Sequence, residues 1–506
     1  MILSTLVFLP VLFALILALW PQKNMIRPMA LVFSLIHFAV GLIVFQDFDT
    51  STAQLQFVEK HMWIEKFGIQ YFLAMDGISF WLVQLTTFLA PLIILASWNS
   101  ISEKVRGFHI CFFILQSAML GSFLAFDAIL FYVFWELSLI PMYFIVGIWG
   151  GSRRIYATLK FFIYTMAGSV LMLVAIIYMM YLTQQAFGQM SSNLLDFYKL
   201  SIPFIGSDFF SMQTLLFFAF ALAFAIKVPL FPLHTWLPDA HVEAPTPGSV
   251  VLAGVMLKMG TFCYMRWVLP LFPEASEYWA WIFIMLGVIG IIYGALVAMV
   301  QPDIKKLVAY SSVSHMGYII IGLFVMNHQG LQGGLYQMLN HGISTGALFI
   351  LIGMIYERTH SREISQYGGL ASVLPNFTIF FFIITLSSIA VPLTNGFVGE
   401  FLILLGVYKA SPWAAGFAVT GVVLGAAYML WMFKRVFYGE KGPLVADEKH
   451  PLIDLNVREF VILVPFVIMV FVMGIFPNHF LKYSEASIDY LVKNKSSYQL
   501  TIKGEQ

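Results

Sequence analysis

Four charged side chains stand inside apolar stretches that are long enough to cross a membrane. They are Glu136 in LFYVFWELSLI, Lys227 in FAFALAFAIKVPLF, Lys258 in VVLAGVMLKMGTF and Glu400 in FVGEFLILLGV. A charge at the bilayer centre costs about 2.5–3.5 kcal/mol on insertion scales, so such residues usually face a bundle interior or a hydrated path. Two acids and two bases on separate helices predict a relay that loads and passes protons or cations. The alternative is a set of internal ion pairs that hold helices together.

The residue types fit such a relay because burial disfavours their charged forms, so that protonation can respond to a nearby charge. We expect the charge of Glu136 to depend on a lysine partner. Lys227 stands just before a predicted helix break, where it can release its proton. Lys258 stands midway along its apolar stretch, and Gly254 and Gly260 leave room there for water or for a neighbouring helix.

Two histidines extend the predicted relay, His315 in SVSHMG and His341 in MLNHGIST. Histidine changes its charge between pH 5 and 8 after small environmental shifts, which suits a proton shuttle. The alternative is a histidine that neighbouring helices hold in one tautomer. The predicted relay therefore comprises Glu136, Lys227, Lys258, His315, His341 and Glu400.

A polar, proline-rich segment, HTWLPDAHVEAPTPGSVVLAG (234–254), follows the stretch that contains Lys227. Its ionisable residues, His234, Asp239, His241 and Glu243, are candidates for proton access from the cytoplasm. The alternative is that they cap the helix that follows.

The composition predicts an all-α polytopic membrane protein. Of 506 residues, 60% are hydrophobic and only 10% are charged, whereas soluble domains carry about 25% charged residues. The net charge of +1 leaves no basic face for nucleic acid. Cys111 and Cys263 lie inside apolar runs, which argues against a disulfide framework and against a Cys-ligated metal cluster. We therefore expect no cofactor, metal or redox chemistry in this chain.

The apolar runs predict fourteen transmembrane spans within one membrane domain, because a span needs about 20 mostly apolar residues. The predicted spans are 2–20, 28–46, 73–98, 107–125, 128–149, 157–184, 209–231, 245–269, 278–300, 303–325, 332–356, 371–408, 412–437 and 455–476. Span twelve is too long for one straight helix and contains Pro392 followed by Thr394-Asn395-Gly396. Span seven contains Pro229. Both are predicted to be discontinuous, with ordinary proline kinks as the alternative.

The two predicted breaks share a sequence, because AIKVPL (225–230) resembles SIAVPL (388–393). They fall five spans apart, so two five-helix units would insert in opposite senses, and inverted repeats with discontinuous helices are typical of transporters. We predict three N-terminal spans in 1–106, a first repeat in 107–269, an inverted second repeat in 278–437, a last span at 455–476 and a tail at 477–506.

Basic residues predict the orientation, because cytoplasmic loops carry an excess of Lys and Arg. One set of alternate loops carries fifteen of them: Lys23, Arg27, Lys104, Arg106, Arg153, Arg154, Lys305, Lys306, Arg358, Arg362, Lys434, Arg435, Lys441, Lys449 and Arg458. The opposite side carries five before the tail: Lys60, Lys66, Lys199, Arg266 and Lys409. With an even number of spans, both termini are predicted to be periplasmic.

The segment FAIKVPLFPLHTWLPDAHVEAPTPGSVVLAGVMLKMG (224–260) closely resembles the signature of the antiporter-like subunits of proton-pumping NADH:quinone oxidoreductase, respiratory complex I. The resemblance continues in order through FWELSLIPMYFIVGIWGG (134–151), SSVSHMG (311–317), LNHGISTGALF (339–349) and GFVGEF (396–401). Most members carry lysine on the broken span twelve, whereas the subunit M type (subunit 4 in mitochondrial naming) carries glutamate. Glu400 therefore indicates the subunit M type.

The resemblance implies roles and surroundings for these residues. Glu136 and Lys227 would form a coupled pair, Lys258 would connect to His315 and His341, and Glu400 would serve a second half-channel. NADH, flavin, iron–sulfur clusters and quinone would bind other subunits. The partners would be the L-type and N-type antiporter-like subunits and the small K-type subunit, in a bacterial inner membrane.

Two other functions remain open at this point. The chain could belong to a multi-protein sodium/proton antiporter or to a membrane-bound hydrogenase, both of which have related subunits. It could also be a structural spacer in such a complex, with charges that no longer move protons.

Overall fold

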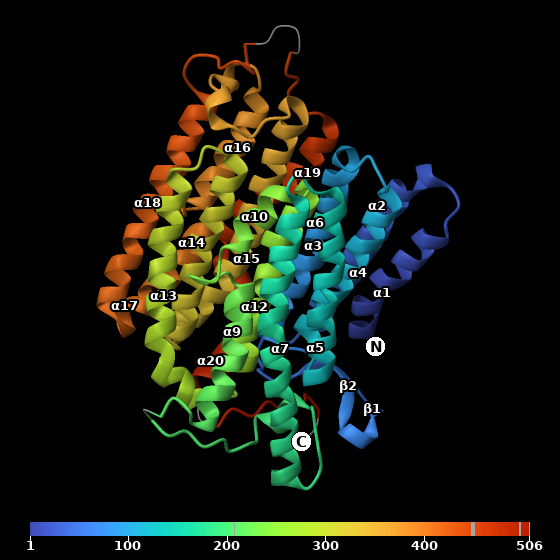
Figure 1. Cartoon of the computed structure of the whole chain (residues 1–506), viewed down its shortest axis with the longest axis vertical. Helices are drawn as coiled ribbons and strands as arrows, with labels where there is room; N and C mark the ends of the chain where they lie inside the picture. The colour runs from blue at the N-terminus through green and yellow to red at the C-terminus, as the bar shows by residue number, and fades with distance from the viewer. Residues whose placement is uncertain (207, 447–450, 495–496, 505–506) are drawn as a thin grey trace.

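The computed structural model describes residues 1–206, 208–446, 451–494 and 497–504, and Lys449 of the predicted cytoplasmic set lies outside them. The molecule is an upright bundle of helices with both chain ends in its lower part (Figure 1). The helices are α1 (Ile2–Leu19), α2 (Ile26–Asp47), α3 (Gly77–Ser100), α4 (Val105–Leu124), α5 (Ala128–Leu137), α6 (Leu139–Trp149), α7 (Arg154–Phe187), α8 (Leu194–Phe197), α9 (Met212–Lys227), α10 (Trp236–Glu243), α11 (Thr246–Val251), α12 (Leu257–Cys263), α13 (Pro273–Met299), α14 (Ile304–Phe324), α15 (His328–Thr359), α16 (Pro375–Ser388), α17 (Asn395–Ala410), α18 (Pro412–Phe437), α19 (Val457–Ile475) and α20 (Pro477–Lys493).

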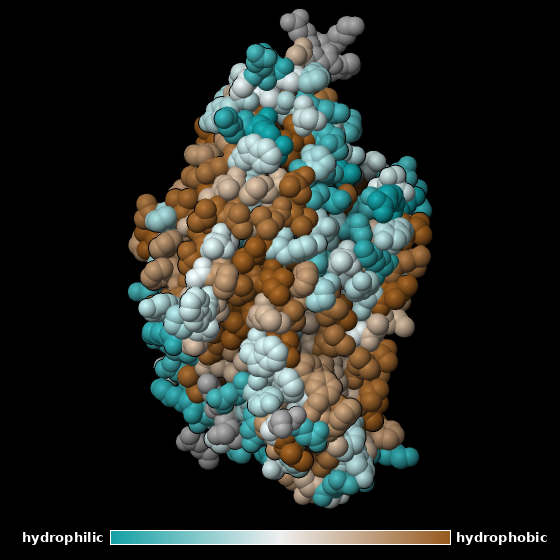
Figure 2. Space-filling view, turned by 60° about the vertical axis from the view of Figure 1, so that its left-hand side comes forward, coloured by the Kyte–Doolittle hydropathy of each residue, from teal (hydrophilic) through white to brown (hydrophobic). Residues whose placement is uncertain are grey.

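Hydropathy identifies an integral multi-pass membrane protein. Among the described residues, twelve helical stretches are long and apolar enough to cross a membrane, and each overlaps one of the predicted spans. Two shorter apolar helices, α9 and α16, occupy the predicted spans seven and twelve. Figure 2 shows a broad hydrophobic zone across the middle of one face, with hydrophilic residues gathered mostly toward the two ends. This distribution fits a hydrocarbon layer between two aqueous phases.

Both predicted discontinuous spans are interrupted, and other groups bond to the carbonyls freed at the breaks. Helix α9 ends at Lys227, and the indole of Trp236 at the start of α10 donates to the Ile226 carbonyl at 2.8 Å. Helix α16 ends at Ser388, whose carbonyl accepts a hydrogen bond from His315 at 3.1 Å. Irregular backbone at membrane depth is tolerated where protein replaces the lost bonds in this way.

Span eight is not a regular α-helix along its whole length. Helices α11 and α12 are joined by a π-helical stretch, Leu252–Met256, and a second one, Tyr264–Val268, follows α12. π-Helical insertions shift the direction of the side chains around them and are frequent at functional sites. The short α12 between them carries Lys258.

Helix α15 forms the centre of the second half of the bundle. Every residue from Gly330 to Ile355 is buried. Buried on all sides, this helix can carry polar side chains only where neighbouring helices supply hydrogen-bond partners.

The structure corrects the prediction near residue 73. Residues Gln56–Ile64 (β1) and Ile69–Met75 (β2) form an antiparallel hairpin, so the third span begins at Gly77 rather than at residue 73. The Asp76 side chain accepts hydrogen bonds from the backbone of Ile78 and Ser79, which fixes the start of α3. The hairpin lies at the lower end of the bundle (Figure 1).

The predicted tail also has regular structure. Helix α20 turns its buried side chains, which include Phe480, Ile488 and Leu491, toward the bundle. The chain beyond it returns to the hairpin, where the backbone of Leu55 donates to the Thr501 carbonyl at 2.9 Å. Residues 477–494 and 497–504 are therefore packed against the membrane domain.

Candidate functional site

The first part of the predicted relay lies where α9 ends against α5 and α6. The Lys227 ammonium is buried, donates to the Ser138 hydroxyl at 3.2 Å and lies 4.9 Å from the centroid of the Trp135 ring. Trp135 and Ser138 are on either side of Glu136 in the chain, so the ammonium lies against the stretch of chain that carries Glu136. The Glu136 Oε1 atom is buried and has no hydrogen-bond partner among the described residues. Glu136 and Lys227 are thus neighbours without a direct ion pair.

Lys258 begins a second group of ionisable residues. Its side chain is fully buried, and its ammonium donates to the Ala253 carbonyl and, at 2.6 Å, to Nδ1 of His341. The Ala253 carbonyl belongs to the π-helical stretch before α12, where the ordinary helical hydrogen bonds are displaced. An ammonium can only donate, so Nδ1 of His341 accepts and the proton of the neutral ring is on Nε2.

The two predicted histidines lie side by side. The ring centroids of His341 on α15 and His315 on α14 are 5.7 Å apart, with an angle of 68° between the rings. In the described part of the chain, Nε2 of His341 and Nδ1 of His315 are buried and have no hydrogen-bond partner. Each ring therefore has one nitrogen engaged and one free.

Glu400 ends the group on α17. Its Oε1 atom lies 3.7 Å from Nε2 of His315 and accepts a hydrogen bond of 3.2 Å from the Gln337 amide. Lys258, His341, His315 and Glu400 thus form a continuous series of neighbours on α12, α15, α14 and α17. All four side chains are buried.

Tight helix packing connects the two groups. A methyl group added at Gly260 on α12 would lie 3.2 Å from the Cβ atom of Lys227. The Tyr264 hydroxyl also donates to the Ala221 carbonyl of α9 at 2.7 Å. Gly260 therefore provides the close approach of a neighbouring helix, one of the two uses predicted for it. The described residues contain no direct hydrogen bond between Lys227 and Lys258.

The four predicted proton-access residues do not form one cluster. His234 lies between the Phe231 and Tyr293 rings, with centroids 5.7 and 5.1 Å away. Asp239 forms an ion pair of 2.8 Å with Lys160 on α7.

His241 and Glu243 have opposite surroundings. His241 is fully buried, and its ring stacks on Phe349 with centroids 4.7 Å apart. Glu243 accepts a hydrogen bond of 2.9 Å from the Arg153 backbone and lines a cavity. In the described structure none of the four hydrogen-bonds to Lys227.

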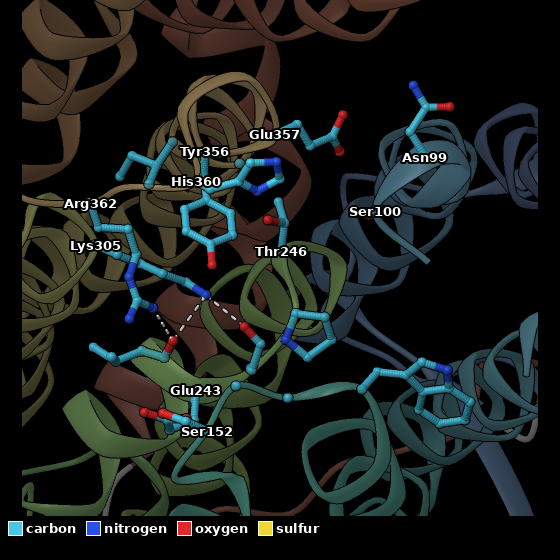
Figure 3. Close-up of a pocket in the computed structure, with 18 residues that line it drawn as sticks. Asn99, Ser100, Ser152, Glu243, Thr246, Lys305, Tyr356, Glu357, His360 and Arg362 are labelled. Carbon is cyan, nitrogen blue, oxygen red and sulfur yellow. Dashed lines mark hydrogen bonds between the residues drawn. The ribbon is translucent and has the colours of Figure 1, made fainter. Parts of the chain in front are cut away.

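The cavity, of about 660 Å³, opens where α3, α6 and α15 end and α14 begins (Figure 3). Lys305 reaches across its wall and donates to the Ala244 carbonyl at 2.6 Å and to the Val242 carbonyl at 3.4 Å. Arg362 donates to the same Val242 carbonyl at 2.6 Å. These cations bind carbonyls freed at the C-terminal end of α10, where a positive charge is favourable.

Several polar residues at the site were not identified from the sequence. Gln337 and Asn340 lie on α15 beside Glu400, and Asn340 donates to the Gln337 carbonyl oxygen at 2.9 Å. They precede His341 by four and one positions, so helical spacing alone could have placed Gln337 on the same face.

A second unidentified group lies at the break between α16 and α17. The Ser344 and Ser387 hydroxyls are 2.5 Å apart, and Asn395 bonds to both. Polar side chains here bind together the two halves of span twelve and helix α15.

A buried ion pair at the lower end of the bundle was also missed. Arg266 donates to Asp76 at 2.5 Å, and both side chains are almost fully buried. The sequence predicted Arg266 only as a basic residue at a span end. The pair joins the end of span eight to the start of α3.

Comparisons with known proteins give matches over nearly the whole chain. Residues 125–425 match the family model described as NADH:quinone oxidoreductase/Mrp antiporter, TM. Residues 4–125 match that of NADH-ubiquinone oxidoreductase chain 4, amino terminus. NADH-quinone oxidoreductase subunit M of Rhodobacter capsulatus is 44% identical over 503 residues, which cover 97% of this chain and 96% of the relative.

Solved structures show the same fold. A chain of respiratory complex I from Thermus thermophilus with bound NADH superposes with a TM-score of 0.85 at 32% identity, covering 97% of this chain and 99% of that one. A chain of the Mrp complex from Dietzia sp. DQ12-45-1b superposes with a TM-score of 0.81 at 20% identity, covering 98% of each chain. The second match concerns the fold alone.

Proposed function

The chain belongs to the family of NADH-quinone oxidoreductase subunit M, and from this membership we propose how it moves protons. It is a proton-translocating membrane subunit of an NADH:quinone oxidoreductase. In our proposal the protons pass through Glu136, Lys227, Lys258, His315, His341 and Glu400. NADH, flavin, iron–sulfur clusters and quinone bind other subunits.

The observation that carries the proposal is the unbroken series from Lys258 to Glu400. The Lys258 ammonium already donates to Nδ1 of His341, so a proton can pass to that nitrogen along an existing hydrogen bond. His341 can then release a proton from Nε2, which moves one proton across the ring. His315 lies between His341 and the Glu400 carboxylate, which is the acceptor at the far end.

In our proposal, Glu136 and Lys227 control the proton affinity of Lys258, the first residue of this series. Lys227 has one hydrogen-bond acceptor, Ser138, together with the face of Trp135. Its charged form therefore depends on the ionised form of Glu136, because a buried ammonium needs a nearby negative charge. A change of charge at Glu136 would alter the proton affinity of Lys227 and, through the packed helices, that of Lys258.

The cavity at the end of α10 supports proton access on the cytoplasmic side. It is lined by Glu243, the one predicted access residue that reaches it, and by Lys305, His360 and Arg362 (Figure 3). We propose that water in this cavity delivers protons toward the interior. His234, Asp239 and His241 would contribute farther along the same segment.

The last part of our proposal concerns the partner subunits, the topology and the membrane. It assembles with other subunits of complex I. We propose that these include the L-type and N-type antiporter-like subunits and the small K-type subunit. We also propose fourteen spans with two inverted repeats, a bacterial inner membrane and periplasmic termini.

Replacing Lys258 by Met tests the proposal, because the change retains most of the volume and removes every donor. We expect the initial rate of NADH-driven proton uptake to fall by at least about tenfold, equivalent to about 1.4 kcal/mol in a barrier. Uptake would be measured in membrane vesicles, with the amount of assembled complex determined on native gels. Lys199→Met is the matched control, since Lys199 is exposed and pairs with Asp196. Parental uptake by an assembled Lys258→Met complex would refute the relay.

A further inference from the structure

Glu400 is held by an uncharged side chain whose own orientation is fixed. The Gln337 amide nitrogen donates to Oε1 of Glu400 at 3.2 Å, and the Gln337 carbonyl oxygen accepts from the Asn340 amide at 2.9 Å. The Gln337 nitrogen therefore faces Glu400 and its oxygen faces Asn340, the arrangement that serves an ionised carboxylate, which only accepts. Asn340, Gln337 and Glu400 therefore form a directed series of donors.

The oxygen that Gln337 holds is the one that faces His315. Nε2 of His315 lies 3.7 Å from the same Oε1 atom of Glu400. A rotation of the carboxylate would carry this oxygen away from the imidazole. The hydrogen bond from Gln337 opposes that rotation.

The backbone next to Glu400 leaves a place for the two amides. Gly399 precedes Glu400 on α17, and a methyl group there would meet the Gln337 carbonyl oxygen and lie 2.7 Å from the Asn340 amide nitrogen. Because Gly399 has no Cβ atom, the side-chain amides of Gln337 and Asn340 fit between α15 and α17. All three side chains of the series are buried, so water does not replace the bonds from the surface.

We propose that Gln337, oriented by Asn340, is a positioning residue that holds the proton-accepting oxygen of Glu400 toward His315. The inference rests on the proposed function, in which Glu400 receives protons. Gln337 does not itself titrate. It acts by fixing one oxygen and by donating to the charged form of the carboxylate.

A double-mutant cycle in the assembled complex tests the inference. Gln337→Met retains the length of the side chain and removes the donor, and Glu400→Gln removes the group on which it is inferred to act. We expect Gln337→Met to lower proton uptake by about tenfold, the order expected when a hydrogen bond to a charged group is lost. In the Glu400→Gln background the same change should have no further effect, because coupled residues are not additive.

Gln332→Met is the matched control. Gln332 lies on the same helix and is similarly buried, but it donates to the Leu481 carbonyl and bonds to Ser484 rather than to Glu400. We expect this variant to pump like the parent. Reduced uptake in Gln332→Met equal to that in Gln337→Met would overturn the inference, because it would show a general packing effect.

A pH profile provides a second readout that a packing role would not change. The titratable side chains near Glu400 are His315 and Tyr318 on α14 and Tyr428 on α18. Without the Gln337 donor, the charged carboxylate loses a stabilising bond, so the pH profile of uptake should move to higher pH. An unchanged profile in Gln337→Met would contradict the inference.

The outcomes separate the inference from the proposed function. If Glu400→Gln pumps like the parent, the relay through Glu400 fails. If Glu400→Gln is impaired while Gln337→Met pumps like the parent, only the inference fails. Losses that multiply in the double variant would also overturn it. If the Gln337→Met complex does not assemble, Asn340→Ala takes its place in the cycle. This change removes the amide that donates to Gln337 and leaves Gln337 itself in place.

Discussion

At the residue scale, the two buried lysines differ in what balances their charge. Lys258 donates to two acceptors, the Ala253 carbonyl and the His341 ring. Lys227 has one hydroxyl acceptor and an aromatic face, which stabilises a cation by about 0.5–2 kcal/mol. The charged form of Lys227 therefore depends more on a neighbouring acid, which is the role proposed for Glu136.

Lys227→Arg tests whether this site must release its proton. Arginine retains the positive charge but cannot be deprotonated at accessible pH. We expect the variant to lose proton uptake nearly as severely as Lys227→Ala, by at least about tenfold, equivalent to about 1.4 kcal/mol. The measurement is the initial rate of NADH-driven proton uptake in vesicles, normalised to the amount of assembled complex. Near-normal uptake in the Arg variant would show that a static charge is sufficient.

At the element scale, the interrupted helices bring the ionisable residues together. Lys227 is the last residue of α9, and Lys258 lies on α12 between two π-helical stretches. Glu400 follows the break between α16 and α17 by one helical turn and a half. Each interruption exposes backbone groups that regular helices would satisfy, and the polar side chains nearby bond to several of them.

Gly260→Leu tests the packing that joins the two groups of the relay. A methyl group at Gly260 would already lie 3.2 Å from Cβ of Lys227, so a larger side chain must push α9 and α12 apart. Overpacking of this kind costs about 1–3 kcal/mol. We expect lower thermal stability of the assembled complex together with reduced proton uptake. The control Gly416→Leu changes a glycine with no atom within 4 Å of an added methyl group, and it should leave both properties unchanged.

The sequence was sufficient to place the helices and the ionisable residues, because a membrane span has a strong hydropathy signal and a charge within it is conspicuous. Pro392 and the Thr-Asn-Gly run after it also predicted the break after α16. The hairpin at 56–75 was missed because β1 has no alternation of polar and apolar residues, and because the apolar β2 runs almost directly into the third span. The π-helical stretches were missed because no feature of LAGVM (252–256) or YMRWV (264–268) distinguishes them from an ordinary α-helix.

The contacts within the site could not be predicted from the sequence. Gln337 is an uncharged amide, and such side chains also occur in membrane helices as packing groups. Its hydrogen bond to Glu400 depends on how closely α15 and α17 approach each other, which the sequence does not specify. The same holds for Ser138, which becomes an acceptor for Lys227 only through the packing of α9 against the end of α5.

At the scale of the whole molecule, the relay runs through the buried interior of a bundle with an apolar surface. The cavity with Lys305 and Arg362 lies at one end, while the hairpin and the returning C-terminal segment close the other. Lys503 pairs with Asp49 at 2.9 Å and Leu55 bonds to Thr501, so the C-terminal segment is attached to the chain between α2 and β1. We propose that protons pass through these buried groups rather than along the outside of the bundle.

The most direct test of the central claim compares Glu400→Ala with Glu400→Lys in intact membrane vesicles. Alanine leaves nothing titratable at this position of α17, whereas lysine can still bind and release a proton. Moving one charge across 100 mV requires about 2.3 kcal/mol, so a defective site fails first under a full membrane potential. NADH-driven proton uptake would be measured with and without a potassium ionophore in K⁺ buffer, which dissipates the membrane potential but keeps the proton signal. We predict a severe loss for Ala and a smaller loss for Lys, each largest without the ionophore. Parental uptake by both variants under full potential would contradict proton transfer through Glu400.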